Sequence, residues 1–336
     1  MNNLNADQKY LVEEFYEHYR EGDLTRRQFI KLLAHITGSM AATVALMSLL
    51  GCTPGELPAP TDPMPELETT PLEPPTQAEG DGTPEQPAST GLTPVPGAKS
   101  PFSVPEGDPA VVAQDITFAS GGDTISAYFT QPAGSEMPTV VLVCHENRGL
   151  TPHIRDVARR FAKAGYAAFA IDLLSREGGS AALDASQIPG LLGDAGTERH
   201  VADFLAGYAY LQTLSTVDST RVGMTGYCFG GGITWDVATS LPELKAAVPF
   251  YGRAPSIGPV SNIKAAVLGV YAEQDSRINA GIPTLEQALK DAGITYQFNI
   301  YPGVDHAFHN DTGGRYIEEQ ATQAWMDTLA WFEQYL

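Results

Sequence analysis

The residues best suited to chemistry lie around Cys228, in a glycine-rich stretch that reads Gly226-Tyr227-Cys228-Phe229-Gly230-Gly231. An apolar run from Arg221 to Gly226 predicts a strand before the cysteine, and a helix is expected to begin directly after it. Glycine on both sides permits a strained strand-to-helix turn in which backbone segments approach closely. Such a turn can present a thiol as a nucleophile. The alternative is a buried cysteine that only packs.

A thiol nucleophile needs a base to take its proton, and the base needs an acid to orient it. Two histidines follow Cys228 in the chain, and His306 comes soon after the last expected strand, Thr295 to Tyr301. A loop at a strand end is where the base is required, so we predict His306 in that role. His309 lies one turn further along and is expected to be exposed. A loop histidine with a purely structural role is the alternative interpretation of His306.

The orienting acid is expected after the preceding strand, Ala265 to Tyr271, because nucleophile, acid and histidine follow in that order in this arrangement. Asp275 is the predicted acid, and Glu273 is its nearby rival. Asp305 adjoins the histidine and would point elsewhere. Asp275 could alternatively cap the N-terminus of a helix.

A second polar segment, His145-Glu146-Asn147-Arg148-Gly149, follows a short apolar run from Thr139 to Cys144 that predicts a buried strand. The loop after this strand and the residue after the nucleophile can each supply a backbone N–H group to an oxyanion hole. We therefore predict that the amides of Asn147 and Phe229 stabilise the negative charge of a tetrahedral intermediate.

In combination and order, these motifs resemble the dienelactone hydrolase family of the α/β-hydrolase superfamily, over about 225 residues at the C-terminal end. The matching segments are residues 145–149, residues 226–231, Asp275, and Gly303-Val304-Asp305-His306-Ala307-Phe308. The resemblance implies a Cys-His-Asp triad that cleaves an ester or lactone through a thioester. It also implies that Glu146 contacts the resting thiol and moves when substrate binds. A carboxylate beside a thiol disfavours the thiolate, which limits oxidation between turnovers.

The substrate pocket departs from the family pattern. Family members that act on dienelactone hold its carboxylate with an arginine four residues after the histidine, where this chain has Asn310. A second arginine is expected before the turn, but the segment from Leu183 to Glu198 contains none. Other candidates to contact substrate are Arg148 and Tyr227, while Arg176 and Arg199 flank the gap. Alternatives are therefore a broader carboxylesterase or thioesterase, or an inactive binding lipoprotein.

The elements that must position these residues alternate between strands and helices. A hairpin is expected first, around Gly121-Gly122-Asp123, and repeated strand–helix units follow it. This order predicts an α/β fold with a mostly parallel, doubly wound sheet and helices on both faces. The other expected strands are 166–171 and 246–250, and the expected helices are 154–164, 197–214, 284–292 and 315–336.

The first 51 residues resemble an export signal rather than part of the fold. Thr25-Arg26-Arg27-Gln28-Phe29-Ile30-Lys31 resembles a twin-arginine motif, and an apolar stretch from Leu32 to Leu50 follows it. Leu49-Leu50-Gly51-Cys52 resembles the lipobox of bacterial lipoproteins, so Cys52 is the expected lipidation site. The polar residues before Thr25 are expected to remain in the cytoplasm. An uncleaved membrane helix is the alternative.

Residues 52–107 are predicted to form a disordered linker, and residues 108–336 the catalytic domain. The linker carries 14 of the 25 prolines with several acidic residues, a composition that buries too little apolar surface to fold. This organisation predicts an extracytoplasmic, membrane-anchored lipoprotein of a bacterium that is recognised by the twin-arginine export machinery.

Charge and cysteine content limit the remaining function classes. The formal net charge is −20, which argues against nucleic acid as a partner. The three cysteines have no zinc-binding spacing, and no metal or organic cofactor is implied. A disulfide between Cys144 and Cys228 is an alternative that would abolish the nucleophile. The expected partner is a small ester or lactone.

Overall fold

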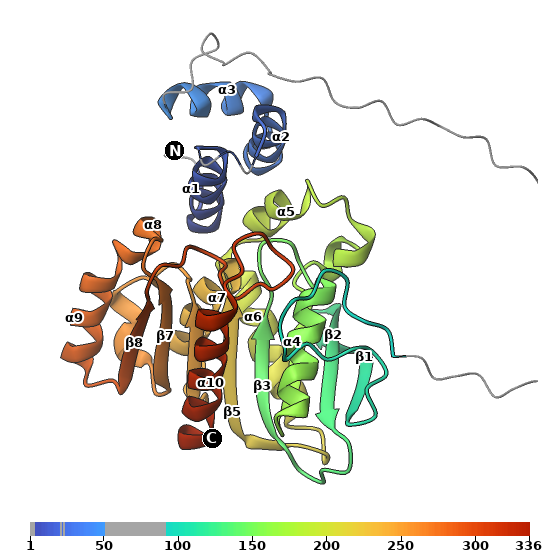
Figure 1. The fold of residues 1–336 in the computed structure, drawn as a ribbon. Coiled ribbons are helices and arrows are strands. Elements are labelled where there is room, and N and C mark those ends of the chain that lie inside the picture. Colours follow the sequence, from blue (N-terminus) through green and yellow to red (C-terminus); the bar gives the residue numbers. More distant parts are fainter. Residues whose placement is uncertain (1–3, 21, 23, 51–91) are drawn as a thin grey trace, which may run out of the picture.

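The computed structural model describes residues 4–20, 22, 24–50 and 92–336. An eight-stranded sheet forms its centre, in the order β1-β2-β4-β3-β5-β6-β7-β8 (Figure 1). The strands are β1 (Val111–Ser120), β2 (Asp123–Pro132), β3 (Thr139–Cys144), β4 (Ala167–Ile171), β5 (Asp218–Tyr227), β6 (Ala246–Phe250), β7 (Ala266–Ala272) and β8 (Tyr296–Tyr301). The hairpin β1–β2 and the pair β2–β4 are antiparallel, and all other pairs are parallel. The predicted fold class is confirmed.

The central strands are short apolar runs because both of their faces are covered by helices. Every residue of β3, β4, β6 and β7 is buried. Helices α4 (Pro152–Lys163) and α10 (Glu318–Tyr335) cover one face, where Phe161 contacts Trp325 and Phe332. Helices α6 (Thr197–Leu211) and α7 (Phe229–Ser240) cover the other. The remaining helices of the domain are α5 (Ile188–Ala195), α8 (Ser276–Asn279) and α9 (Ile282–Ala292).

Strand register brings the predicted site segments to one edge of the sheet. Cys144 at the end of β3 pairs with Gly226 of β5, and Tyr227 at the end of β5 pairs with Phe250 of β6. The segments after β3, β5, β7 and β8 therefore leave the sheet together at its carboxyl edge. This is the edge at which doubly wound sheets bind ligands.

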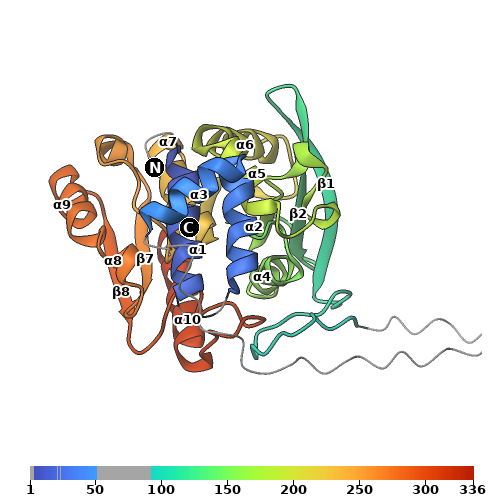
Figure 2. The ribbon, with the colours of Figure 1, turned by 90° about the horizontal axis from the view of Figure 1, so that it is seen from above.

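The N-terminal segment lies on the domain, whereas the sequence predicted a leader separate from it. Helices α1 (Ala6–Arg20), α2 (Arg26–Thr37) and α3 (Met40–Leu49) stand above the carboxyl edge of the sheet (Figures 1 and 2). Both α1 and α2 contact α5. Phe29, Leu33 and Ile36 of α2 are fully buried. Apolar residues that suggested a signal therefore pack against the domain. The sequence pattern does not show that such a contact exists.

No helix in the described ranges is by itself long and apolar enough to cross a membrane. Helices α2 and α3 together meet the length and composition of a span, but they are bent by 115° at the break between them. The predicted lipidation site, Cys52, lies outside the described residues.

The predicted linker also differs from the structure at its C-terminal end. Residues 92–107 pack on the domain. The N–H of Val104 donates to Asp156 at 2.6 Å, and the carbonyl of Val104 accepts from Arg159 at 2.7 Å. The N–H groups of Lys99 and Ser100 both donate to Asp311. Buried charged groups of the domain hold this proline-containing segment in place, so its composition alone was a poor guide. Most of the predicted linker, residues 52–91, lies outside the described residues.

Candidate active site

The turn around Cys228 is strained and tightly packed. Cys228 has φ 59° and ψ −118°, a region that residues with a side chain rarely adopt, and α7 begins directly after it. A Cβ atom on Gly226 would lie 2.2 Å from the Gly230 carbonyl oxygen, and one on Gly230 would lie 2.4 Å from the His145 carbonyl oxygen. Both glycines are therefore required by close backbone approach. The helix N-terminus also favours negative charge on the sulfur.

His306 and Asp275 form a direct buried pair. The imidazole Nδ1 and the carboxylate Oδ2 are 2.5 Å apart, and the residues are 4% and 3% exposed. The two other nearby acids bind backbone groups instead of the imidazole. Glu273 is exposed and accepts from the Gly303 N–H, while Asp305 accepts from the backbone N–H of His306. Asp275 also accepts from the N–H of Ile278 and so caps α8, so that one carboxylate both pairs with His306 and caps a helix.

Nearby negative charge makes the His306 imidazole more basic. Burial opposes the charge on His306, but attraction to Asp275 outweighs it and raises the pKa of His306 well above its usual value. Burial would raise the pKa of Asp275, yet the nearby His306 lowers it. For Cys228, burial and then the charge of Glu14 raise the thiol pKa.

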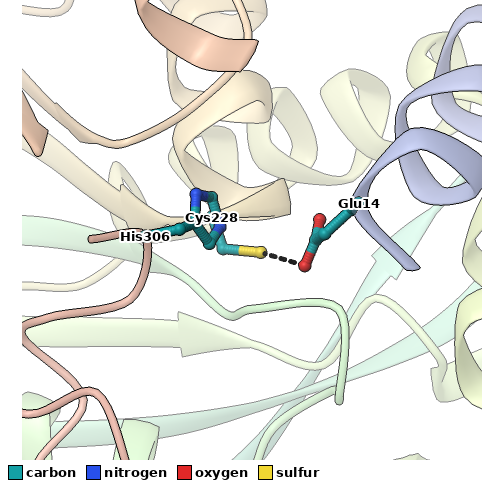
Figure 3. A group of neighbouring side chains, drawn as sticks. All are labelled: Glu14, Cys228 and His306. Carbon is teal, nitrogen blue, oxygen red and sulfur yellow. Dashed lines mark hydrogen bonds between the residues drawn. The ribbon is translucent and has the colours of Figure 1, made fainter. Parts of the chain in front are cut away.

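The carboxylate that contacts the thiol is Glu14 of α1. Cys228 Sγ donates to Glu14 Oε1 at 3.2 Å, and Figure 3 shows the sulfur directed at this carboxylate. Glu146, which the family resemblance placed at the thiol, instead accepts a hydrogen bond from Asn310 Nδ2 at 2.7 Å. The neutral amide at position 310 therefore holds Glu146, while Glu14 takes the position beside the sulfur.

The loop after β3 is held rigidly. His145 is fully buried, and its two ring nitrogens contact the Glu146 carbonyl and the N–H of Leu173. Within the described ranges, the backbone N–H groups of Asn147 and Phe229 donate to no other group. Both amides are thus available to an oxyanion, although Asn147 already donates through its side chain to Glu14 Oε1 at 2.6 Å.

A cavity of about 870 Å³ reaches Cys228 and His306 from the surface. Two of the candidate substrate contacts, Arg148 and Asn310, line it. Tyr227 does not, because it is fully buried and its ring stacks on His309 with 4.9 Å between centroids.

His309 was expected to be exposed, but it is 2% exposed. It lies in a core cluster with Tyr227 and His153. Burial lowers its pKa well below the usual value. The two flanking arginines are in ion pairs, Arg176 with Asp203 and Arg199 with Glu177.

The thiol of Cys228, the imidazole of His306 and the carboxylate of Glu14 lie within 4.8 Å of one another. These are ligand types that Zn²⁺ accepts. However, Nδ1 of His306 is held by Asp275, which leaves Nε2 without a hydrogen-bond partner and able to accept a proton. We therefore assign the cluster to proton chemistry. Cys144 and Cys228 are both free thiols, which excludes the alternative disulfide.

Sequence reasoning missed the contribution of α1. Besides Glu14, Tyr10 Oη lies 3.5 Å from the Cys228 sulfur. The amphipathic spacing of Tyr10, Leu11, Glu14 and Phe15 could have indicated a packed helix face. Nothing in that spacing indicates which surface the face would cover.

The order of the strands, the strained turn after β5, and the acid and histidine after β7 and β8 define an α/β-hydrolase. Comparison with known proteins narrows this class. The model of the Dienelactone hydrolase family matches residues 125–336. A "Putative carboxymethylenebutenolidase" of Salmonella typhi is 34% identical over 262 residues, covering 73% of this chain and 96% of its own. A protein of the same name from Escherichia coli K12 is 35% identical over 243 residues, covering 68% and 89%.

A solved structure supports the same assignment. The "Putative Dienelactone Hydrolase" from Klebsiella pneumoniae is 33% identical, with a TM-score of 0.63 and coverage of 67% of this chain and all of its own. The chain therefore belongs to the dienelactone hydrolase family, and it is a hydrolase of that type.

Proposed function

We propose that this hydrolase cleaves a carboxylic ester or lactone with Cys228 as nucleophile, His306 as base and Asp275 as the orienting acid. The observation that carries the proposal is the buried 2.5 Å contact between Asp275 and Nδ1 of His306, an imidazole that has a nitrogen within 4.8 Å of the Cys228 sulfur. Three groups from three strand ends converge in the order that this chemistry uses.

The reaction would run through a thioester. His306 Nε2 takes the thiol proton as Sγ attacks the ester carbonyl carbon, and the N–H groups of Asn147 and Phe229 stabilise the resulting oxyanion. The C–O bond then breaks, and the imidazolium returns the proton to the alkoxide. Water, deprotonated by His306, attacks the thioester and releases the acid and the thiol. In a lactone the alkoxide stays attached to the acyl group.

The pocket supports a broader esterase or thioesterase as a second candidate. Asn310 holds Glu146 rather than presenting a positive charge, so the family's carboxylate contact is missing at this position. Arg148 is exposed at the cavity and offers a positive charge at a different position. A panel of lactones, acyl esters and thioesters, compared by kcat/KM, separates the two candidates.

Replacing the proposed nucleophile tests the mechanism directly. Cys228→Ala is expected to abolish hydrolysis of p-nitrophenyl acetate, because no other thiol of the described chain faces His306. Cys144→Ala is the matched control: it removes a buried thiol from β3 and should retain activity. Turnover that survives in Cys228→Ala would show that another group attacks the ester.

We also propose export and anchoring. The motif at Arg26 and Arg27 begins α2, and it supports recognition by the twin-arginine machinery; Cys52 would then become the lipidated N-terminus of an extracytoplasmic, membrane-anchored protein. Mass analysis of the mature chain tests this proposal. An acylated Cys52 is expected, and a chain that keeps Met1 after export contradicts it.

A further inference from the structure

Helix α1 lies above the carboxyl edge of the sheet, where the proposed active site is (Figures 1 and 2). Its inward face consists of Tyr10, Leu11, Glu14 and Phe15, and none of these is more than 7% exposed. Glu14 and Phe15 also line the cavity that reaches Cys228. The helix is therefore a packed wall of the site.

Ion pairs fix the helix at both of its ends. Asp7 accepts from Arg253 at 2.9 Å, and Glu17 accepts from Arg277 at 2.7 Å. The Arg277 guanidinium also lies 4.8 Å from the centroid of the Tyr10 ring. Acidic residues on α1 thus meet arginines of the catalytic domain, and this complementarity sets the position of the residues between them.

Glu14 occupies space that the reacting ester group would need. Its Oε1 accepts from the thiol of Cys228 at 3.2 Å and from Asn147 Nδ2 at 2.6 Å. A carbonyl under attack must lie against the sulfur and near the loop after β3, whose Asn147 amide is a proposed oxyanion donor. The carboxylate therefore bridges these same two parts of the site, and Figure 3 shows its contact with the sulfur.

The contact also directs the thiol proton away from the base. Cys228 donates to Glu14, while His306 Nε2 has no hydrogen-bond partner within the described ranges. Burial and the negative charges of Glu14 and Glu146 disfavour the thiolate, while His306 acts in the opposite direction. Tyr10 Oη lies 3.5 Å from the sulfur and adds no positive charge. A thiol in this state is a weak nucleophile.

We propose that α1 is an intramolecular inhibitor that occupies the place of the ester substrate and holds Cys228 as an unreactive thiol through Glu14. The inference rests on the proposed function, because it takes Cys228 to be the nucleophile. Residues 4–50 precede Cys52, so the proposed maturation at that residue would remove the inhibitor together with the leader. The hydrolase would then become fully active only after export.

Neutralising Glu14 in the full chain tests the contact. In Glu14→Gln, the rate of Cys228 alkylation by iodoacetamide should rise about tenfold or more, because the charge that disfavours the thiolate is gone. Glu13→Gln is the matched control: it makes the same change on the adjacent, exposed residue and should leave the rate unchanged. Peptide mapping assigns the label to Cys228 and separates it from Cys52 and from the buried Cys144.

Displacing the whole of α1 tests whether this helix occupies the place of the substrate. Leu11 is fully buried, and its Cδ1 would lie 3.3 Å from a Cβ on Gly193 of α5. Leu11→Asp buries an unpaired carboxylate there and should release α1. Alkylation of Cys228 and hydrolysis of p-nitrophenyl acetate should then both increase, and circular dichroism establishes that the sheet domain remains folded. If Leu11→Asp does not fold, the alkylation rate of Glu14→Gln alone tests the proposal.

The outcomes distinguish this proposal from the one it rests on. Equal rates of Cys228 alkylation in the native chain, Glu14→Gln and Leu11→Asp would overturn the proposal that α1 is an inhibitor. A decrease in turnover in Glu14→Gln also overturns it, because Glu14 would then assist catalysis. Faster alkylation without turnover of any ester in the panel supports the inhibitory contact and contradicts the proposed hydrolysis through Cys228.

Discussion

The pair between Asp275 and His306 gives the sharpest quantitative prediction. Asp275→Asn keeps the shape of the side chain, and asparagine also caps helices well, so α8 and the fold should be retained. What disappears is the negative charge at 2.5 Å from Nδ1, in a pair whose members are 3% and 4% exposed.

The expected magnitude follows from this geometry. A buried hydrogen bond to a charged group contributes about 1.5–3 kcal/mol, which corresponds to a loss of about 10- to 150-fold in kcat/KM. The asparagine amide can also donate to Nδ1 and leave the proton on Nε2, where it blocks proton uptake from Cys228. With this wrong tautomer included, the loss should reach about 10²- to 10⁴-fold.

The pH profile gives a second readout of the same change. The charged and titratable groups that face the imidazole are Asp275 from the segment after β7, Cys228 from the turn, Glu14 from α1 and Tyr251 from the segment after β6. Asp275 raises the pKa of His306, so its neutralisation lowers that pKa. The acidic limb of kcat/KM for p-nitrophenyl acetate should therefore move to lower pH. Turnover is measured in the native chain and in the Glu14→Gln background, so that α1 does not limit the rate.

Glu273→Gln is the control for this prediction, because Glu273 is the nearest other carboxylate on the same loop and is exposed. It should retain nearly full activity. A loss of less than about threefold in Asp275→Asn, well below the value of one charged hydrogen bond, would refute the orienting role. So would an equal loss in both variants.

Two further predictions concern stability. Gly230→Ala should unfold the chain at markedly lower temperature than Gly258→Ala, because the new Cβ would lie 2.4 Å from the His145 carbonyl oxygen whereas Gly258 has open space; similar melting temperatures would contradict this. Asp311→Asn should lower the free energy of unfolding, measured in urea, by about 1.5–3 kcal/mol, because it weakens a buried, charged hydrogen bond from Arg160. The pKa of Asp311 is lowered despite burial, through its hydrogen bond to His153 and the charge of Arg160. Its stabilisation is thus complete above the unfolded value of about 3.9 and is lost as the pH falls through the folded pKa. The variant should therefore lose less stability than the native chain on acidification below about pH 4, and an unchanged slope would refute the assignment.

Local sequence patterns were sufficient to predict the strands of the catalytic domain and the polar residues at their ends. The runs before Cys228, Asp275 and His306 are short, apolar and bounded by turns, so each predicts a buried strand with a polar residue at its end. Parallel strands in one sheet share a carboxyl edge. That geometric necessity brings the three residues together without any knowledge of the packing, and the strand boundaries in the structure agree with the expected ones within a few residues.

Only the tertiary structure decided what lies beside the sulfur. The family resemblance placed Glu146 there, but the hydrogen bond from Asn310 holds it and Glu14 takes the position. Glu14 is separated from Cys228 by 214 positions, and no local pattern encodes such a contact. The same reason explains His309, whose burial depends on stacking against Tyr227, and residues 92–107, which the buried Asp156 and Asp311 hold. Periodicity and spacing report what a segment can form, whereas the surface that it covers depends on the rest of the folded chain.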